Sequence, residues 1–240
     1  MGEVKMSGVC RSFSYVFGSA RVSRAIVEDF RLRGLEYIPL PPFSALDNPV
    51  ADHADMLIFP HDGNLTVYES YYRENSELFA RTKTDITTVP DPVDAKYPYD
   101  IALNALSLGD RLFCLEKYTS HAVKKLFGNI INVPQGYSRC TVCKVDENAI
   151  ITADPSIAVH ARDCGIDVLE ITGGEILLPG YSYGFIGGCS VRIGDEMLFC
   201  GDITAHPDFA SIDAFLYSHG CTPVRMGDGI LTDFGGFVTI

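Results

Sequence analysis

The chain is short of positive charge, because 19 Lys and Arg stand against 31 Asp and Glu, for a formal net charge of −12. Surfaces that bind nucleic acid normally carry a basic stripe, so this balance argues against a nucleic-acid partner. No apolar run approaches the length of a membrane span, and the opening MGEVKMSGVCRS lacks the apolar core of a signal peptide. We therefore expect a cytoplasmic protein with reduced cysteines and no membrane partner.

The chain also lacks a dinucleotide-binding signature. No G-x-G-x-x-G follows a first strand and opens a helix, so a βαβ dinucleotide fold fits poorly, and we expect no cofactor. Its 240 residues, 47% of them hydrophobic, are enough to bury a full core. We expect one domain over residues 1–240.

What the chain does contain is an internal repeat. Residues 178–202 hold a glycine-rich segment, two short apolar runs around a Gly–Asp turn, and an acidic end, which together predict a β-hairpin. Residues 132–154 follow the same pattern 48 positions earlier, and a glycine pair returns 48 positions later. The matched positions are Val145 and Ile193, Ala153 and Gly201, Asp154 and Asp202, and Gly187–Gly188 and Gly235–Gly236. A fixed period of this kind indicates repeated supersecondary units.

A second pattern, helix–glycine–strand–loop, occurs five times. The first copy places a helix near Ser23–Arg33, with Ser23 as N-cap and Gly34 as the stop, before a strand at Leu35–Leu40. The other helices are expected at 75–84, 120–127, 155–164 and 207–219.

Hairpins precede the last four of these helices, and an acid ends each second strand. Because Glu69, Glu116, Asp154 and Asp202 recur at equivalent positions, they suggest capping or turn formation. A fifth hairpin would be split between Val9–Tyr15 and Phe234–Ile240. Such a pairing would close a ring and remove its exposed sheet edge. The alternative is an unrelated series of hairpins and helices in an ordinary α+β domain.

Five ββαβ units in a closed ring resemble the pentein fold, an α/β-propeller with pseudo-five-fold symmetry. The segment Ala54–Phe59, followed by Asp62–Gly63, is similar to the "PDMVF…D" stretch of the first repeat in the pentein enzymes. Gly235–Gly236 is similar to the double glycine that precedes their catalytic cysteine. The chain is most similar to an uncharacterised bacterial family assigned to this fold.

The resemblance implies a divergent relative of the guanidino-group-modifying enzymes: arginine and agmatine deiminases, dimethylarginine hydrolases and amidinotransferases. If the ring is catalytic, it implies a hydrolase or transferase that acts on C–N bonds of amidines. The usual catalytic pair is missing, however. No Cys follows the last glycine pair in Phe237–Ile240, and no His stands in Tyr137–Arg139 or Phe185–Gly187.

The residues themselves offer other candidates for a nucleophile and a base. Cys189 follows Gly187–Gly188 and would act as a thiolate near a cation or a His, or else is simply a packed thiol. His53 is the candidate base near neutral pH. Cys140 and Cys143 have C-x-x-C spacing, but strand alternation would direct them to opposite faces, so we expect no metal site.

Acidic and amide side chains near the first strands of the units are candidate ligands for a cationic substrate. Ring symmetry would bring these positions toward one axial mouth, where carboxylates can hold a guanidinium in a planar fork. The substrate-binding candidates are Asp55, Asp62, Asp100, Asn104 and Asp233. The other reading of the acids around His53 is a solvated loop.

Two functions follow from this sequence. In the first, the ring mouth binds a small cationic, amidine-like or amino-acid ligand. In the second, a non-catalytic ring docks a protein or ribonucleoprotein partner, as in the initiation factor 6 family. The sequence leaves the oligomeric state open.

Overall fold

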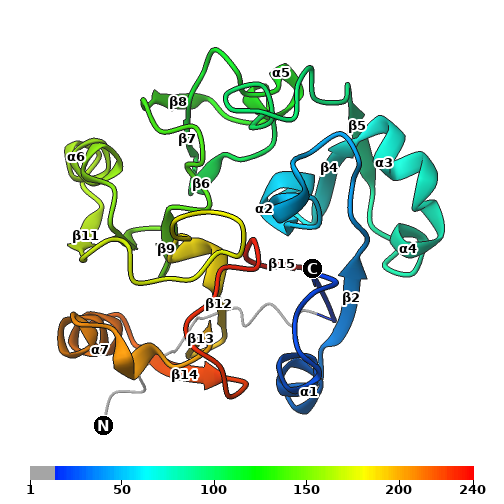
Figure 1. Ribbon diagram of the computed structural model, residues 1–240. Coiled ribbons are helices and arrows are strands. Elements are labelled where there is room, and N and C mark those ends of the chain that lie inside the picture. The colour runs from blue at the N-terminus through cyan, green and yellow to red at the C-terminus, as the bar shows by residue number, and fades with distance from the viewer. Residues whose placement is uncertain (1–13) are drawn as a thin grey trace, which may run out of the picture.

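A computed structural model describes residues 14–240 and shows five small sheets arranged around a central axis, with helices on the outside (Figure 1). Each sheet has three strands. The first strand pairs antiparallel with the second, and the second pairs parallel with the third across a helical connection. This ββαβ order is the predicted one, so the α/β ring of five units is confirmed.

Four units follow one another along the chain, and we number them from 1 to 4. Their strands are β3 (Ile58–His61), β4 (Asn64–Tyr68) and β5 (Ile86–Val89); β6 (Leu106–Leu108), β7 (Arg111–Cys114) and β8 (Asn129–Asn132); β9 (Val142–Lys144), β10 (Ala149–Thr152) and β11 (Asp167–Glu170); and β12 (Ser190–Ile193), β13 (Glu196–Cys200) and β14 (Thr222–Met226).

Unit 5 joins the two ends of the chain. Strand β15 (Val238–Thr239) pairs antiparallel with β1 (Tyr15–Ser19), and β1 pairs parallel with β2 (Glu36–Leu40). The prediction that a C-terminal and an N-terminal strand close the ring is therefore confirmed. The predicted position of the N-terminal strand was wrong, because β1 starts at Tyr15; residues 9–13 of that prediction lie outside the described part of the chain.

Helices lie mainly on the periphery of the ring (Figure 1). They are α1 (Arg24–Leu32), α3 (Glu69–Glu74), α4 (Ser76–Ala80), α5 (His121–Lys124), α6 (Pro155–Asp163) and α7 (Phe209–Ser218). A further short helix, α2 (Ala54–Leu57), lies near the axis (Figure 1), and the 3-10 turns of residues 14–240 are η1 (Asn48–Val50), η2 (Gly187–Cys189) and η3 (Ile203–Ala205).

Side-chain caps explain where several helices begin. The Ser23 hydroxyl accepts from the Ile26 backbone N–H, and the Asp154 carboxylate accepts from those of Ser156 and Ile157. The predicted capping roles of Asp154 and Asp202 are confirmed, since Asp202 accepts from the Thr204 N–H at η3. Glu69 instead forms the first turn of α3.

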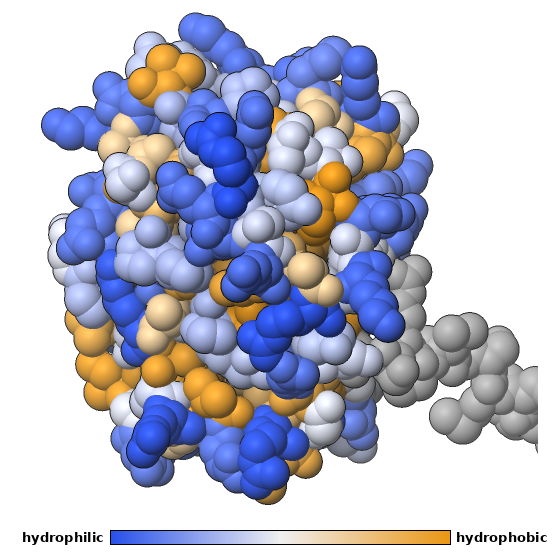
Figure 2. Space-filling model, turned by 90° about the vertical axis from the view of Figure 1, so that its right-hand side faces the viewer, coloured by the Kyte–Doolittle hydropathy of each residue, from blue (hydrophilic) through white to orange (hydrophobic). Residues whose placement is uncertain are grey.

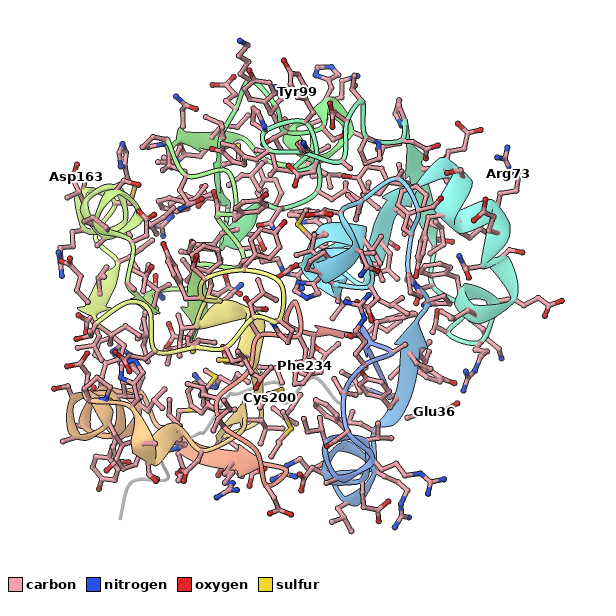
Figure 3. All side chains as sticks on the ribbon, viewed as in Figure 1. Glu36, Arg73, Tyr99, Asp163, Cys200 and Phe234 are labelled. Carbon is pink, nitrogen blue, oxygen red and sulfur yellow. The ribbon has the colours of Figure 1, made fainter. Side chains whose placement is uncertain are left out.

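Side chains fill the centre of the ring. Phe234 and Cys200 lie near the middle, whereas Glu36, Arg73, Tyr99 and Asp163 lie at the outside (Figure 3). The side of the ring that faces the viewer in Figure 2 is mostly hydrophilic, with apolar residues in small groups. Over residues 14–240, no helix has the length and apolar character needed to cross a membrane.

Candidate functional site

Polar side chains from four parts of the chain meet near the ring axis. His53 is the N-cap residue of α2 and Asp55 lies in its first turn, Asn104 precedes β6, Cys140 precedes β9, and Asp233 precedes β15. All five are buried, with no more than 5% of each residue exposed. Four of them are the predicted His53, Asp55, Asn104 and Asp233, so the expected convergence of these residues is seen. We call this group the axial cluster.

Glycines allow the chain to approach Asp233 this closely. A Cβ on Gly188 would lie 1.9 Å from Asp233 Oδ1, and a Cβ on Gly235 would lie 2.2 Å from the Cβ of His53. Gly235 also has a φ of +77°, which L side chains rarely adopt. The paired glycines of the repeat therefore serve close packing around a buried carboxylate.

The two carboxylates of the axial cluster have unequal partners. Asp233 accepts backbone N–H groups of Phe185 at 2.9 Å and Gly235 at 2.8 Å, so both its oxygens are bonded. Asp55 Oδ2 accepts from the Cys140 thiol at 2.8 Å, but Asp55 Oδ1 is buried and has no hydrogen-bond partner among residues 14–240. That oxygen has unused capacity to accept.

Burial sets the charge state of this cluster. It raises the pKa of Asp55 well above its usual range, and the neighbouring Asp233 charge raises it further. Burial also raises the pKa of Asp233. Burial and the charge of Arg21 lower the pKa of His53 to about 3, so its imidazole is neutral. His53 Nδ1 lies 4.0 Å from Asp55 Oδ1 and 4.0 Å from Asp233 Oδ1.

The Cys140 sulfur is held on two sides. Asn104 Nδ2 donates to it at 2.8 Å, while the thiol donates to Asp55. Asn104 Oδ1 in turn accepts the backbone N–H of Arg139 at 3.0 Å, which fixes the amide. Burial, together with the carboxylates of Asp55 and Asp233, raises the pKa of the Cys140 thiol well above its usual value. The sulfur is therefore a neutral thiol while no cation occupies the site.

A pocket of about 220 Å³ opens onto the axial cluster. Aromatic side chains form much of its wall, and Tyr181 and Tyr183 at its mouth are 45% and 49% exposed. Its lining consists of Val50, His53, Met56, Tyr137, Cys140, Leu178, Tyr181, Ser182, Tyr183, Phe185 and Asp233. Exposed aromatic rings over a buried carboxylate suit a cation with flat faces.

A second, larger pocket of about 660 Å³ is lined by the first strands of the units, and Asp55 and Arg139 line it as well. The Arg139 guanidinium donates to the carbonyls of Ile58 at 2.8 Å and Phe237 at 3.0 Å, so it ties β3 to the segment that leads into β15. Asp55, bonded to Cys140, borders this pocket while Cys140 borders the smaller one. The axial cluster therefore separates the two pockets.

The proposed nucleophile, Cys189, has different surroundings. It lies in η2, is fully buried in an apolar cluster, and its thiol donates to the Ile186 carbonyl at 3.3 Å. Burial raises its pKa well above the usual value, and Cys189 does not line the small pocket. This is the packed thiol of the alternative reading, and the geometry does not support Cys189 as a thiolate.

Three predicted binding residues, Asp62, Asp100 and Asn104, line neither of the two pockets. Asp62 and Gly63 form the turn between β3 and β4, with φ of +47° and +79°, and the Asp62 side chain is 76% exposed. Asp62 serves the two-residue hairpin turn, so its placement in the site was wrong. Asp100 is buried behind Tyr137, whose hydroxyl donates to Asp100 Oδ2 at 2.9 Å.

Sequence reasoning missed the thiol of the site, Cys140. It lies in a turn before β9, while Cys143 lies in β9 with its sulfur 3.6 Å from that of Met197, so the two cysteines do not form a pair. The 48-residue period was the signal that could have found it, because it aligns Cys140 with Gly188 beside Asp233. Within residues 14–240, no three His, Cys, Asp or Glu are grouped to hold a metal ion.

Solved structures of other proteins have a similar fold. An amidinotransferase from Microseira wollei, SxtG, has a TM-score of 0.60 at 8% identity, covering 95% of this chain and 94% of its own. The agmatine deiminase of C. jejuni has a TM-score of 0.56 at 12% identity, covering 95% and 93%. The dimethylarginine hydrolase (DDAH) of Pseudomonas aeruginosa, in complex with citrulline, has a TM-score of 0.52 at 10% identity, covering 89% and 92%.

These similarities show that the fold is the pentein fold of the guanidino-modifying enzymes. No curated protein matches the chain. A family model described as "Family of unknown function (DUF6873)" matches residues 17–238, which is nearly the whole chain. The chain therefore belongs to this family of pentein-fold proteins.

Proposed function

We propose that the chain binds a small guanidinium- or amidinium-bearing ligand at the ring axis, held by Asp55 and Asp233. The observation that carries this proposal is the Oδ1 atom of Asp55, which is buried beside a second buried carboxylate and has no hydrogen-bond partner in the described part of the chain. Buried polar atoms are usually satisfied, and an exception calls for a ligand, an ion or a function.

A planar cation with N–H donors suits this unpartnered carboxylate oxygen better than a spherical cation does. A guanidinium presents N–H donors in a fixed plane, which a carboxylate can accept in pairs. Its flat faces can stack on aromatic rings, and Tyr137 and Phe185 line the small pocket together with Asp233 and Cys140. Asp55 is bonded to Cys140 and borders the larger pocket on the other side of the cluster. At about 220 Å³, the pocket suits the cationic head and a short stem, since complete ligand sites are typically about 300–1,000 Å³.

The bound cation would also activate the thiol. A positive charge beside Cys140 favours its thiolate, and the hydrogen bond to Asp55 gives the proton a place to go. The sulfur would then bond to the amidino carbon, the C–N bond would break, and the departing amine would take the proton from Asp55. Water would next attack that carbon while His53 accepts a hydrogen bond from it, and the C–S bond would break. One water proton would return through Asp55 to the sulfur, and the other would leave on the released amine as an ammonium ion. The net reaction is hydrolysis of an amidino C–N bond.

The structural neighbours support this choice of ligand. They include an agmatine deiminase, amidinotransferases and a hydrolase solved with citrulline, all of which are named for guanidino chemistry or its product. At identities of 8–12% they share the fold alone, so the proposal depends on the axial cluster.

Calorimetry with methylguanidinium chloride tests the proposal, with sodium chloride at equal ionic strength as reference. We expect saturable binding to the full chain, at least tenfold weaker in Asp55→Asn and unchanged in Asp62→Asn, which removes an exposed acid of the same type. Circular dichroism checks that both variants fold. No binding to the unchanged protein, or equal loss in the two variants, would refute it.

A further inference from the structure

Among the residues that the structure describes, the small pocket has no Lys or Arg side chain in its lining. Its eleven lining residues are aliphatic, aromatic or polar, with one His, one Cys and one Asp, and none is Lys or Arg. The His53 imidazole is itself neutral, because burial and the charge of Arg21 lower its pKa. A ligand that carries a carboxylate would therefore find no positive charge on this wall to pair with.

Two tyrosines of the pocket wall donate hydrogen bonds to carboxylates outside the lining. The Tyr181 hydroxyl donates to Asp47 Oδ2 at 3.0 Å, and the Tyr137 hydroxyl donates to Asp100 Oδ2 at 2.9 Å. The hydrogen bond to Asp47 helps raise the pKa of Tyr181 to about 12, after burial. Each phenol is thus neutral and already donates its proton to a carboxylate. Toward the pocket, its oxygen can therefore only accept a hydrogen bond.

These acids also influence one another. After burial, the charges of Asp47 and Asp94 contribute to the raised pKa of Asp100. Acidic groups therefore gather behind the mouth in addition to Asp233 in the pocket lining, and no Lys or Arg of the lining offsets them.

Two arginines lie near this wall, since the charge of Arg21 acts on His53 and that of Arg139 acts on Asp55. Arg139 donates to the carbonyls of Ile58 and Phe237 and is absent from the lining of the small pocket. The Arg21 guanidinium is also engaged. Nη1 and Nη2 donate to the carbonyls of Pro49 at 3.1 Å and Asn48 at 2.8 Å, and Nε lies 3.6 Å from the buried Asp52 carboxylate. Arg21 is absent from the pocket lining. Its charge is matched by Asp52 instead of being offered to a ligand.

We infer that this site selects guanidines or amidines that lack a carboxylate, and that it discriminates against amino acids of the arginine type. The inference rests on the proposed function and narrows it, because a mouth whose tyrosines are hydrogen-bonded to Asp47 and Asp100 repels an anionic substituent while it attracts the cationic head.

Two ligands of equal length isolate the effect of the carboxylate. 4-Guanidinobutanamide and 4-guanidinobutanoate differ only in their terminal group, which is neutral in the first and negative in the second. We expect the amide to bind the full chain at least tenfold more tightly by calorimetry at low salt. The ratio should shrink as salt is added, because screening weakens charge repulsion at an exposed mouth.

A variant that adds a cation at the mouth sharpens the test. Ser182 is exposed and lines the pocket, so Ser182→Lys should bring the two affinities to within threefold, while Ser182→Gln, of similar length without charge, should keep the tenfold preference. Equal or tighter binding of the butanoate to the unchanged protein would overturn the inference. If methylguanidinium binds in the same experiment, the proposed function stands although this inference fails; if it does not bind, both fail.

Discussion

Two buried thiols, Cys140 and Cys189, lie just before the first strands of neighbouring units, yet they have opposite surroundings. Cys140 is bonded to Asp55 and Asn104 and borders the pocket at the axis. Cys189 donates only to the Ile186 carbonyl and is packed among apolar side chains. Burial raises the pKa of both thiols, so their acidity does not distinguish them. They differ in that a ligand in the small pocket could contact Cys140 and not Cys189.

The period of 48 residues explains the difference. It aligns Cys140 with Gly188, and Thr141 with Cys189. In unit 3 the axial position therefore carries a thiol, and in unit 4 it carries a glycine that leaves room for Asp233. The next position faces the interior of its unit in both cases, since Thr141 is also buried and donates to the Ser138 carbonyl. A shift of one residue separates a candidate nucleophile from a core residue.

The largest effect, on the free energy of unfolding, is expected from adding a side chain at Gly188, the position of unit 4 that lies near the axis. In Gly188→Ala, the new Cβ would overlap Asp233 Oδ1, at 1.9 Å, so the variant should lose about 3 kcal/mol or more of unfolding free energy. Gly128→Ala adds the same methyl group in open space and should change stability by about 0.5 kcal/mol or less. Urea denaturation of both variants measures this. Similar stability for the two would contradict the packing of Asp233 described above.

Next in size is the effect of the carboxylates on ligand binding. Asp233→Asn should weaken methylguanidinium binding by about tenfold to a hundredfold, because one of two charged acceptors is lost. Cys189→Ser should leave the affinity within twofold, since Cys189 does not border the pocket. Calorimetry on both variants compares them. A larger loss for Cys189→Ser would move the site from unit 3 to unit 4.

Ligand binding should also change the acidity of one thiol and not the other. A guanidinium beside Cys140 favours its thiolate, so the pKa of Cys140 should fall by about one unit or more when methylguanidinium is added. Thiolate absorbance against pH, measured for the unchanged protein and for Cys140→Ser, isolates this change. The same shift in Cys140→Ser would assign it to another cysteine and remove the proposed activation.

The smallest effect concerns stability against pH. Burial raises the native pKa values of Asp55 and Asp233 above their unfolded values near 4, so their contribution is complete at low pH and is lost as pH rises through the native titration. The free energy of unfolding should thus fall by on the order of 1 kcal/mol between pH 5 and pH 8. Asp55→Asn should flatten this slope, whereas Asp62→Asn should not. A slope that is unchanged in Asp55→Asn would place its origin elsewhere.

The architecture was predictable because its signals are local. Ser23 caps α1 through its own hydroxyl, and the glycine pairs recur at a constant spacing before β12 and β15. From the ring, the convergence of Asp55, Asn104 and Asp233 followed by symmetry. These predictions needed only periodicity and the requirement to close a sheet edge.

The identity of the thiol was not predicted because it depends on side-chain direction at a turn. Cys140 was assigned to a strand, but it lies in the turn before β9, where strand alternation does not apply. Asp62 was misplaced for a related reason. It was interpreted as a ligand, while its backbone conformation serves a two-residue hairpin turn with Gly63. In both cases the backbone of a turn, which the residue pattern did not reveal, decided where the side chain lies.

One measurement tests the central claim most directly, the competition between the thiols for a cationic alkylating reagent. 2-Chloroacetamidine carries an amidinium and a displaceable chloride, and 2-chloroacetamide is its neutral analogue. We predict that mass spectrometry after brief treatment near pH 7 finds the amidine on Cys140 before Cys189, that methylguanidinium protects Cys140, and that the neutral reagent is slower. Modification of Cys189 first, or of Cys140 without protection, would contradict a cation site at the ring axis.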